Sequence, residues 1–172
     1  DELLTPELIV CDTLRDVCIG TCAAGNEFTY LVSDEGLVFV MGRNVFGQLG
    51  LGQGSDTYVR RLTAVPVPAP VKQVACGGEH TCVLTVDGAV LTCGRNSHGQ
   101  LGLNGVPTGS LQDPDAKVRE LRPVALPGEA AQIACGKEHT FAVSAGGALF
   151  GWGQNVRGQL GLGHRQNQSL PQ

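Results

Sequence analysis

The feature that most constrains this chain is a ten-residue phrase written three times. It reads GRNVFGQLGL from Gly42, GRNSHGQLGL from Gly94 and GQNVRGQLGL from Gly153. A catalytic site is normally built once, so the repetition indicates architecture before chemistry.

A second phrase precedes each copy of the first. It reads AAGNEFTYLVSDEGLVFVMGRN from Ala23, ACGGEHTCVLTVDGAVLTCGRN from Ala75 and ACGKEHTFAVSAGGALFGWGQN from Ala134, with starts 52 and 59 residues apart. A period of this length is typical of solenoids and propellers. The repeat cores are therefore 23–52, 75–104 and 134–163 of a single unit that fills residues 1–172.

The pattern within each repeat predicts β-strands, because apolar residues alternate with a period of two and Val, Leu, Thr and aromatics are frequent. In the second repeat, strands are expected near His80 to Val86 and Ala89 to Cys93, joined by a two-residue turn at Asp87-Gly88. The strand after the turn is apolar at nearly every position in all three repeats, so both of its faces should be covered. Further strands are expected at 62–67 and 121–126, where prolines indicate a sheet edge.

Three or four antiparallel strands per repeat, each small sheet packed between its neighbours, predict the blades of an all-β propeller. The 25 glycines and the 16% of charged residues suit tight turns and buried strands. The net charge of -4 and pI near 5.5 give no general attraction to nucleic acid or to an anionic membrane.

The A-C-G-x-E-H-T phrase, with the hairpin that ends in G-x-N-x-x-G-Q-L-G-L, resembles the repeat of the regulator of chromosome condensation family. The resemblance implies a seven-bladed propeller, of which about three blades are present. We therefore expect an excerpt of a longer propeller, or a second copy or another chain that supplies the missing flanks, with the next blade's edge strand beginning at Leu170–Gln172.

The histidines and cysteines are the candidate catalytic or metal-binding residues. His80 and His139 occupy one repeat position, which is Phe28 in the first copy, so we expect structural histidines hydrogen-bonded within their blades. The seven cysteines are expected to be reduced, and Cys18 and Cys22, with no second pair at zinc-finger spacing, are not expected to bind metal.

The glycine phrases lack the contexts of a phosphate loop or a dinucleotide site, so no cofactor is expected. The glycines should instead allow tight loops, whereas the asparagines should satisfy loop backbone groups with their side chains. The structural repeat positions are Gly42, Asn44, Gly47, Gly94, Asn96, Gly99, Gly153, Asn155 and Gly158.

One segment breaks the repeat. Residues 104–120 are about seven residues longer than their counterpart in the preceding unit. This is either a solvated variation in loop length or a partner site, because functional contacts gather on such loops. The candidate partner-binding residues on it and on the shorter equivalent loop are Arg60, Arg61, Asp113, Asp115, Lys117 and Arg119.

No constellation of nucleophile, base and orienting group is evident, so the sequence predicts a protein-binding module rather than an enzyme. The resemblance implies scaffold roles, and as an alternative guanine-nucleotide exchange on a small GTPase such as Ran. Light sensing through clustered tryptophans is disfavoured, because Trp152 is the single tryptophan. With no secretory signal and no apolar run of bilayer-spanning length, we expect an intracellular protein, nuclear or cytoplasmic.

Overall fold

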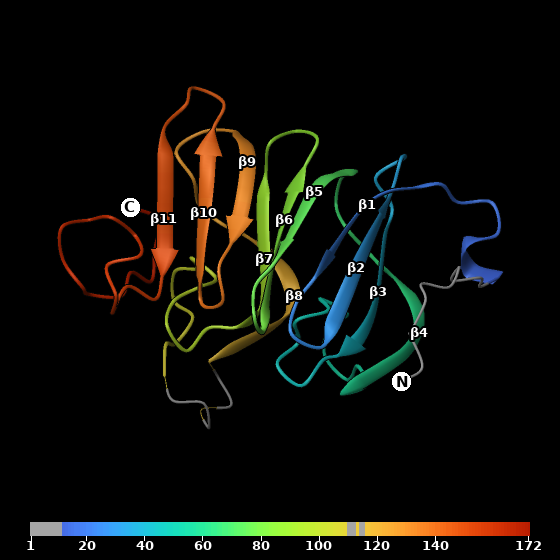
Figure 1. Ribbon diagram of the computed structural model, residues 1–172. Helices are drawn as coiled ribbons and strands as arrows, with labels where there is room; N and C mark the ends of the chain where they lie inside the picture. Colours follow the sequence, from blue (N-terminus) through green and yellow to red (C-terminus); the bar gives the residue numbers. More distant parts are fainter. Residues whose placement is uncertain (1–11, 110–112, 114–115) are drawn as a thin grey trace, which may run out of the picture.

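A computed structural model describes residues 12–109, 113 and 116–172, and its strands form three antiparallel sheets that lie side by side (Figure 1). A 3₁₀ turn, η1 (Asp12–Leu14), precedes the sheets. The first sheet, blade 1, has the strand order β1-β2-β3-β4. Its strands are β1 (Ile19–Ala24), β2 (Phe28–Ser33), β3 (Val38–Arg43) and β4 (Tyr58–Val65).

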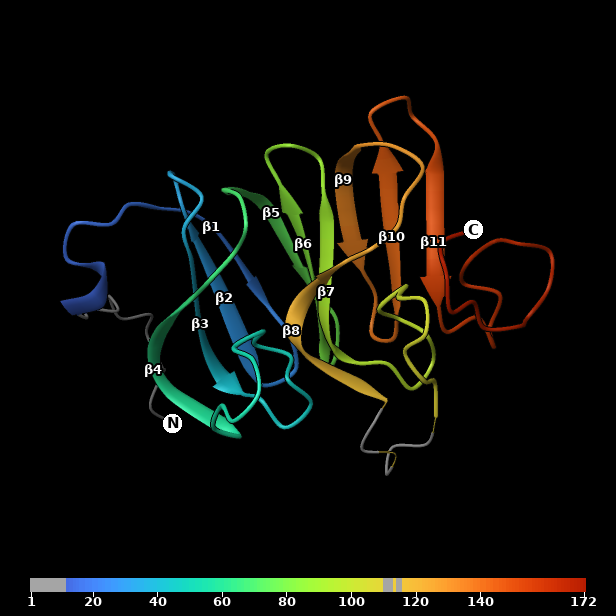
Figure 2. The ribbon, with the colours of Figure 1, turned by 180° about the vertical axis from the view of Figure 1, so that it is seen from behind.

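The other two sheets repeat this arrangement. Blade 2 has the order β5-β6-β7-β8, and blade 3 has the order β9-β10-β11. The strands are β5 (Val71–Cys76), β6 (His80–Thr85), β7 (Val90–Arg95), β8 (Lys117–Pro123), β9 (Ala130–Cys135), β10 (His139–Ser144) and β11 (Leu149–Gly153). The inner strand β5 contacts the inner strands of both neighbouring blades, β1 and β9 (Figure 2). The predicted all-β propeller fold, present in part, is confirmed.

The hairpin turns are one residue longer than predicted. The amide of Gly88 donates to the carbonyl of Thr85, and the amide of Thr85 donates to the carbonyl of Ala89. Gly88 has a φ of 80°, whereas Asp87 keeps a negative φ. A two-residue type I′ turn would need positive φ at both positions, so the hairpin uses a type I turn followed by a left-handed glycine.

The outer strands begin and end earlier than predicted. They run over 58–65 and 117–123 rather than 62–67 and 121–126. Residues before the apolar stretch pair with the preceding strand, as Arg43 does with Tyr58 and Arg95 with Lys117. Pro66 follows the end of β4 because proline offers no amide for a further ladder bond, and β4 is an edge strand as expected.

The C-terminal segment belongs to blade 3, so the expectation that Leu170–Gln172 begins the next blade is wrong. Gly153 and Gln168 exchange two backbone hydrogen bonds of 2.6 and 2.9 Å, and Gly151 and Gln172 exchange two more. This segment runs beside β11, as β4 runs beside β3. It occupies the position of a fourth strand at the edge of blade 3, although only an isolated bridge forms there.

Burial is most complete in blade 2, which has another blade on each side. Every residue of β6 and β7 is buried. In contrast, β11 of blade 3 begins with an exposed Leu149. The hydrophobic core is accordingly divided into two clusters, one between blades 1 and 2 and one between blades 2 and 3. The strand after the turn is thus covered on both faces where a neighbouring blade is present on each side.

In the described ranges, no helix has the length and apolar character that crossing a membrane would require.

Candidate interaction face

At each junction, a backbone carbonyl of one blade accepts a hydrogen bond from a threonine of the next blade. The carbonyl of Gln48, in the loop after β3, accepts hydrogen bonds from Thr81 of blade 2 at 2.9 Å and from Tyr30 of its own blade at 3.0 Å. The carbonyl of Gln100, one repeat later, accepts from Thr140 and from Trp152 of blade 3, each at 2.9 Å. The first and second G-Q-L-G-L loops are therefore connectors to the following blade.

His80 also acts between blades, so the expectation of a bond within its own blade is wrong. Nε2 of His80 lies 3.0 Å from Oγ1 of Thr140, which is on blade 3. The Thr140 hydroxyl already donates to Gln100, so His80 is the donor and carries its proton on Nε2. His139 is half-buried and packs edge-on against Phe141, with ring centroids 5.8 Å apart.

The three repeated asparagines are fully or almost fully buried and close their loops in the same way. In the second repeat, Oδ1 of Asn96 accepts from the amide of Leu101 at 3.0 Å, and Nδ2 donates to the carbonyls of Val106 and Pro107. Asn44 and Asn155 make the matching bond to Leu49 and Leu160. These bonds hold each loop where its leucine enters the core.

The glycine before each connector allows the next blade to approach. A Cβ built on Gly47 would lie 2.4 Å from Cα of Arg119, and one on Gly99 would lie 2.5 Å from Cα of Ser169. Gly158 has the same positive φ, but nothing described lies within 4 Å of its Cβ position. Gly42, Gly94 and Gly153 likewise have φ between 101° and 108° and approach the start of the second strand.

A row of five charged side chains and one glutamine crosses all three blades where the second strand of each begins. We call it the charged ladder. It consists of Glu27, Arg43, Glu79, Arg95, Glu138 and Gln154, two repeat positions taken from each blade.

Each arginine of the charged ladder joins its own blade to the next. Arg43 lies 2.9 Å from Glu27 and 3.4 Å from Glu79, and Arg95 lies 2.7 Å from Glu79 and 3.8 Å from Glu138. Phe46 lies under both guanidinium groups, 5.8 and 5.6 Å from its ring centroid. The ladder therefore orders side chains across two blade junctions.

Backbone bonds fix the loops that carry the ladder. The amide of Asn26 donates to the carbonyl of Gly78 at 3.3 Å, and the amide of Gly78 donates to the carbonyl of Lys137 at 2.9 Å. Backbone hydrogen bonds thus link successive blades at the turns between their first and second strands. The result is a preorganised surface rather than three independent loops.

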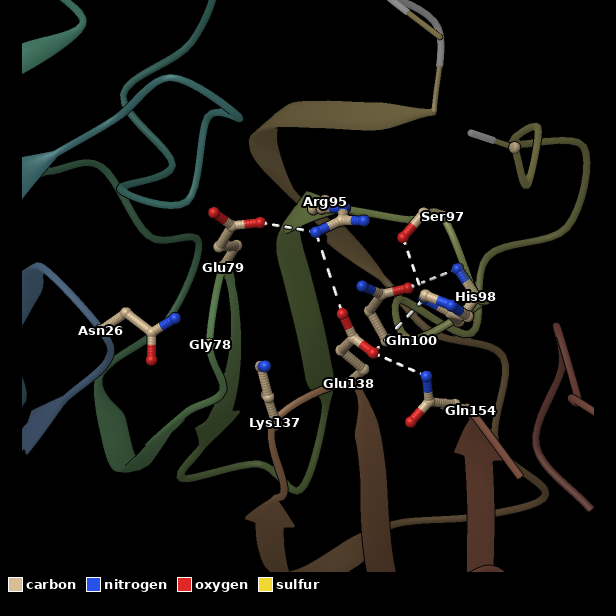
Figure 3. A pocket seen from close by; sticks show the side chains of 11 residues that line it. Asn26, Gly78, Glu79, Arg95, Ser97, His98, Gln100, Lys137, Glu138 and Gln154 are labelled. Carbon is tan, nitrogen blue, oxygen red and sulfur yellow. Dashed lines mark hydrogen bonds and ion pairs between the residues drawn. The ribbon is translucent and has the colours of Figure 1, made fainter. Parts of the chain in front are cut away.

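The ladder borders a hollow of about 560 Å³ between blades 2 and 3 (Figure 3). Lys137, Glu138, Arg95, Ser97, His98 and Asn26 are among the residues that line it. Glu138 has weaker partners than Glu79, because it meets Arg95 at 3.8 Å, His98 at 3.7 Å and the amide of Gln154 at 2.7 Å. Lys137 is exposed beside it. The hollow is therefore polar, with groups of both signs.

Four of the six partner-binding residues proposed from sequence lie on the outer strands rather than on loops. Arg60 and Arg61 are exposed on β4, and Lys117 and Arg119 are half-buried on β8. Arg60 also lines a second hollow with Glu27 and Arg43. Arg60 therefore lies near Arg43 of the ladder, because both line this hollow. Lys117 lies near the ladder because it pairs with Arg95 in the sheet.

The other two partner-binding residues proposed from sequence are Asp113 and Asp115. The backbone carbonyl of Asp113 accepts a hydrogen bond from the amide of Ala116 at 3.3 Å. Asp115 lies outside the described residues.

The glutamates and arginines of the ladder were missed by sequence reasoning. A signal was available, because all three repeats carry a glutamate two residues before the shared threonine and the first two G-x-N phrases carry an arginine. Opposite charges at fixed columns of a repeat can form a row across neighbouring units. The change from arginine to Gln154 in the third repeat marks where the row loses a cation.

Sheets joined side by side through such connectors, with one ordered polar face, define a segment of a β-propeller. Family models of the Regulator of chromosome condensation (RCC1) repeat match residues 35–84 and 87–143, and a second such model matches 71–100 and 130–159. The chain belongs to this family.

Individual relatives agree. The chain is 38% identical over 161 residues to the human protein named Probable E3 ubiquitin-protein ligase HERC3, covering 92% of this chain and 15% of that protein. It is 33% identical over 150 residues to the dog X-linked retinitis pigmentosa GTPase regulator, covering 87% of this chain and 14% of that protein. The crystal structure of Prp20p from Saccharomyces cerevisiae superposes with a TM-score of 0.79 at 22% identity, covering 89% of this chain and 37% of Prp20p. The chain thus spans a small part of the relatives it matches.

Proposed function

We propose that this chain is a protein-docking module and that the charged ladder, with the hollow beside it, is its binding face. The observation that carries the proposal is the row of ion pairs from Glu27 to Glu138, held on backbone-bonded loops of three blades. A face that is ordered before binding loses little conformational entropy when a partner docks.

The chemistry of the hollow specifies the kind of partner. Glu138 lacks the close arginine pairs that neutralise Glu79, and Lys137 beside it is exposed. A partner surface that carries both a basic and an acidic side chain would complement this pair. Exposed Asn26 and half-buried Ser97 and His98 offer further polar contacts at the rim. The proposed partner is therefore a charged protein surface.

The outer strands extend this face. Exposed Arg60 and Arg61 on β4, with Lys117 and Arg119 on β8, lie on the rim of the same end of the sheets and would contact a large partner. The missing flanks of the propeller are proposed to come from further blades of the same protein or from another chain.

The experiment is a charge reversal on the full-length protein. Lys137→Glu changes the proposed face, and Lys72→Glu is the matched control, because Lys72 is another exposed lysine, on β5 near the opposite end of the sheet. Quantitative affinity purification with mass spectrometry should show a partner that Lys137→Glu loses and Lys72→Glu keeps. Equal partner recovery by both variants would contradict the proposed face.

Nucleotide exchange on a small GTPase is the second candidate, and the 33% identity to a GTPase regulator favours testing it. Exchange needs no covalent chemistry, only a surface that binds the nucleotide-free GTPase more tightly than the loaded one. Release of a fluorescent guanine nucleotide should be measured across a panel of small GTPases that includes Ran. Acceleration that Lys137→Glu abolishes would assign exchange, whereas partner loss without acceleration would leave a scaffold.

A further inference from the structure

The charged ladder loses one cation in blade 3. In blades 1 and 2 the ladder glutamate pairs with an arginine of its own blade, at 2.9 and 2.7 Å. The same repeat position in blade 3 is Gln154, which donates a hydrogen bond of 2.7 Å to Oε2 of Glu138. Glu138 therefore lacks the arginine that the other two glutamates have within their own blades.

No other described residue takes the place of that arginine. Oε1 of Glu138 accepts no hydrogen bond from the described residues, and its ion pair with Arg95 spans 3.8 Å. Lys137 makes no ion pair with any residue in the described ranges, and Gln154 is held by Gln159, whose amide donates to it at 3.1 Å. A half-buried carboxylate with so few partners favours a further cation.

The space for a cation is open at the same place. Phe46 of the first connector loop lies under both ladder arginines, which are 5.8 and 5.6 Å from its ring centroid. His98 occupies this repeat position in the second loop, and its Nδ1 lies 3.7 Å from Oε2 of Glu138. The hollow of about 560 Å³ is lined by His98, Glu138 and Gln154 (Figure 3). It lies where an arginine at position 154 would meet both the carboxylate and the ring.

We propose that the hollow binds an arginine side chain of the partner, with the guanidinium on Oε1 of Glu138 and against the ring of His98. This inference rests on the proposed binding face and specifies what that face recognises, a protein segment with an exposed arginine. Arginine fits better than lysine, because a planar guanidinium can donate two N–H groups to a carboxylate and can stack on a ring. The partner thus supplies the cation that Gln154 does not.

The test is photo-crosslinking of the full-length protein with two short peptides. The probe is an acetylated and amidated tetrapeptide of glycine, arginine, photoleucine and glycine. The matched peptide has citrulline in place of arginine, which keeps the shape and removes the charge. After digestion, mass spectrometry locates the crosslinks. Crosslinks to the segments that line the hollow should be several-fold more abundant with the arginine peptide than with the citrulline peptide.

Three variants identify the site. Gln154→Arg restores the residue of the first two repeats and should fill the site from within, so labelling by the arginine peptide should fall to the citrulline level. Glu138→Gln keeps the shape, removes the charge and should have the same effect. Gln132→Arg adds the same charge at an exposed position of β9 and should label as the wild type does. Equal labelling by the two peptides, or unchanged labelling of Gln154→Arg, would overturn the inference.

The result can fail separately from the proposed function. Partner loss in Lys137→Glu without arginine-dependent labelling of the wild type would overturn the arginine site and leave the binding face. Arginine-dependent labelling of the hollow, with equal partner recovery by Lys137→Glu and Lys72→Glu, would support the site and contradict the proposed docking face.

Discussion

Nε2 of His80 on blade 2 donates to the hydroxyl of Thr140 on blade 3 across 3.0 Å, and both side chains are fully buried. The same hydroxyl donates to the carbonyl of Gln100 at 2.9 Å. Thr140 therefore connects a strand residue and a loop carbonyl of one blade to the next blade. Because the hydroxyl is shared, its removal leaves the buried imidazole N–H of His80 without this partner and leaves the Gln100 carbonyl with the Trp152 bond alone.

Thr140→Val should test this junction with almost unchanged shape. Loss of the hydroxyl leaves the imidazole N–H and a carbonyl short of a bond, so we expect the free energy of unfolding to fall by about 1–3 kcal/mol. Urea denaturation measures it. Thr108→Val, at an exposed loop position, is the control and should change it little.

Arg95→Gln should weaken the charged ladder at its centre. Arg95 is 8% exposed and bridges Glu79 and Glu138, so its loss leaves both acids less well paired and should cost about 1–3 kcal/mol. Arg122→Gln breaks the exposed pair with Glu120 and should cost at most about 1 kcal/mol. Equal costs for the two variants, again by urea denaturation, would contradict a structural role for the ladder.

Gly94→Ala should be far more costly than Gly105→Ala. Both glycines have positive φ, but a Cβ on Gly94 would lie 2.5 Å from the Glu79 carbonyl oxygen, whereas nothing lies within 4 Å at Gly105. The left-handed backbone costs about 1–2 kcal/mol in either variant. Crowding at Gly94 should raise the total there to at least about 3 kcal/mol. Thermal and urea unfolding of the pair separate backbone strain from crowding.

His139 should make stability depend on pH. Burial lowers its pKa in the folded protein below the ordinary value, so the unfolded chain binds the proton more readily. The contribution of the neutral side chain is then complete above about pH 6.5 and is lost as the pH falls through the folded pKa. His139→Phe, which installs the residue of the first repeat, should flatten the unfolding free energy between pH 7 and 5. An unchanged slope would show that other groups cause it.

The order of strands and their turns could be read from the sequence, because each depends on neighbouring residues. Alternation of apolar residues predicted the hairpin strands, and Pro66 predicted an edge. The turn at Asp87-Gly88 was predicted one residue too short, because the dipeptide fits both a two-residue turn and a type I turn with a following glycine. The start of β4 was missed because Tyr58 joins the sheet by pairing with Arg43, fifteen residues earlier.

The candidate face was not predicted in the same way. The sequence directed attention to the long segment near Asp113 and to Arg60 and Arg61, since insertions and exposed charges are visible in one dimension. The repeated motifs were assigned a structural role only, although they also contain the ladder residues Glu79, Arg95 and Glu138. A repeated position can serve both roles, because a row of equal positions lies along one face of a propeller.

The sequence by itself determined the repeat, the all-β class and the loops that close each blade, because periodicity, glycine, proline and asparagine act over a few residues. Only the tertiary structure decided which blade each side chain contacts. His80 and Thr140 are 60 residues apart, as are Cys135 and the Ala75 carbonyl that it contacts. Such contacts depend on how one sheet stacks against the next, and side-chain direction across a junction is fixed by that stacking rather than by neighbours along the chain.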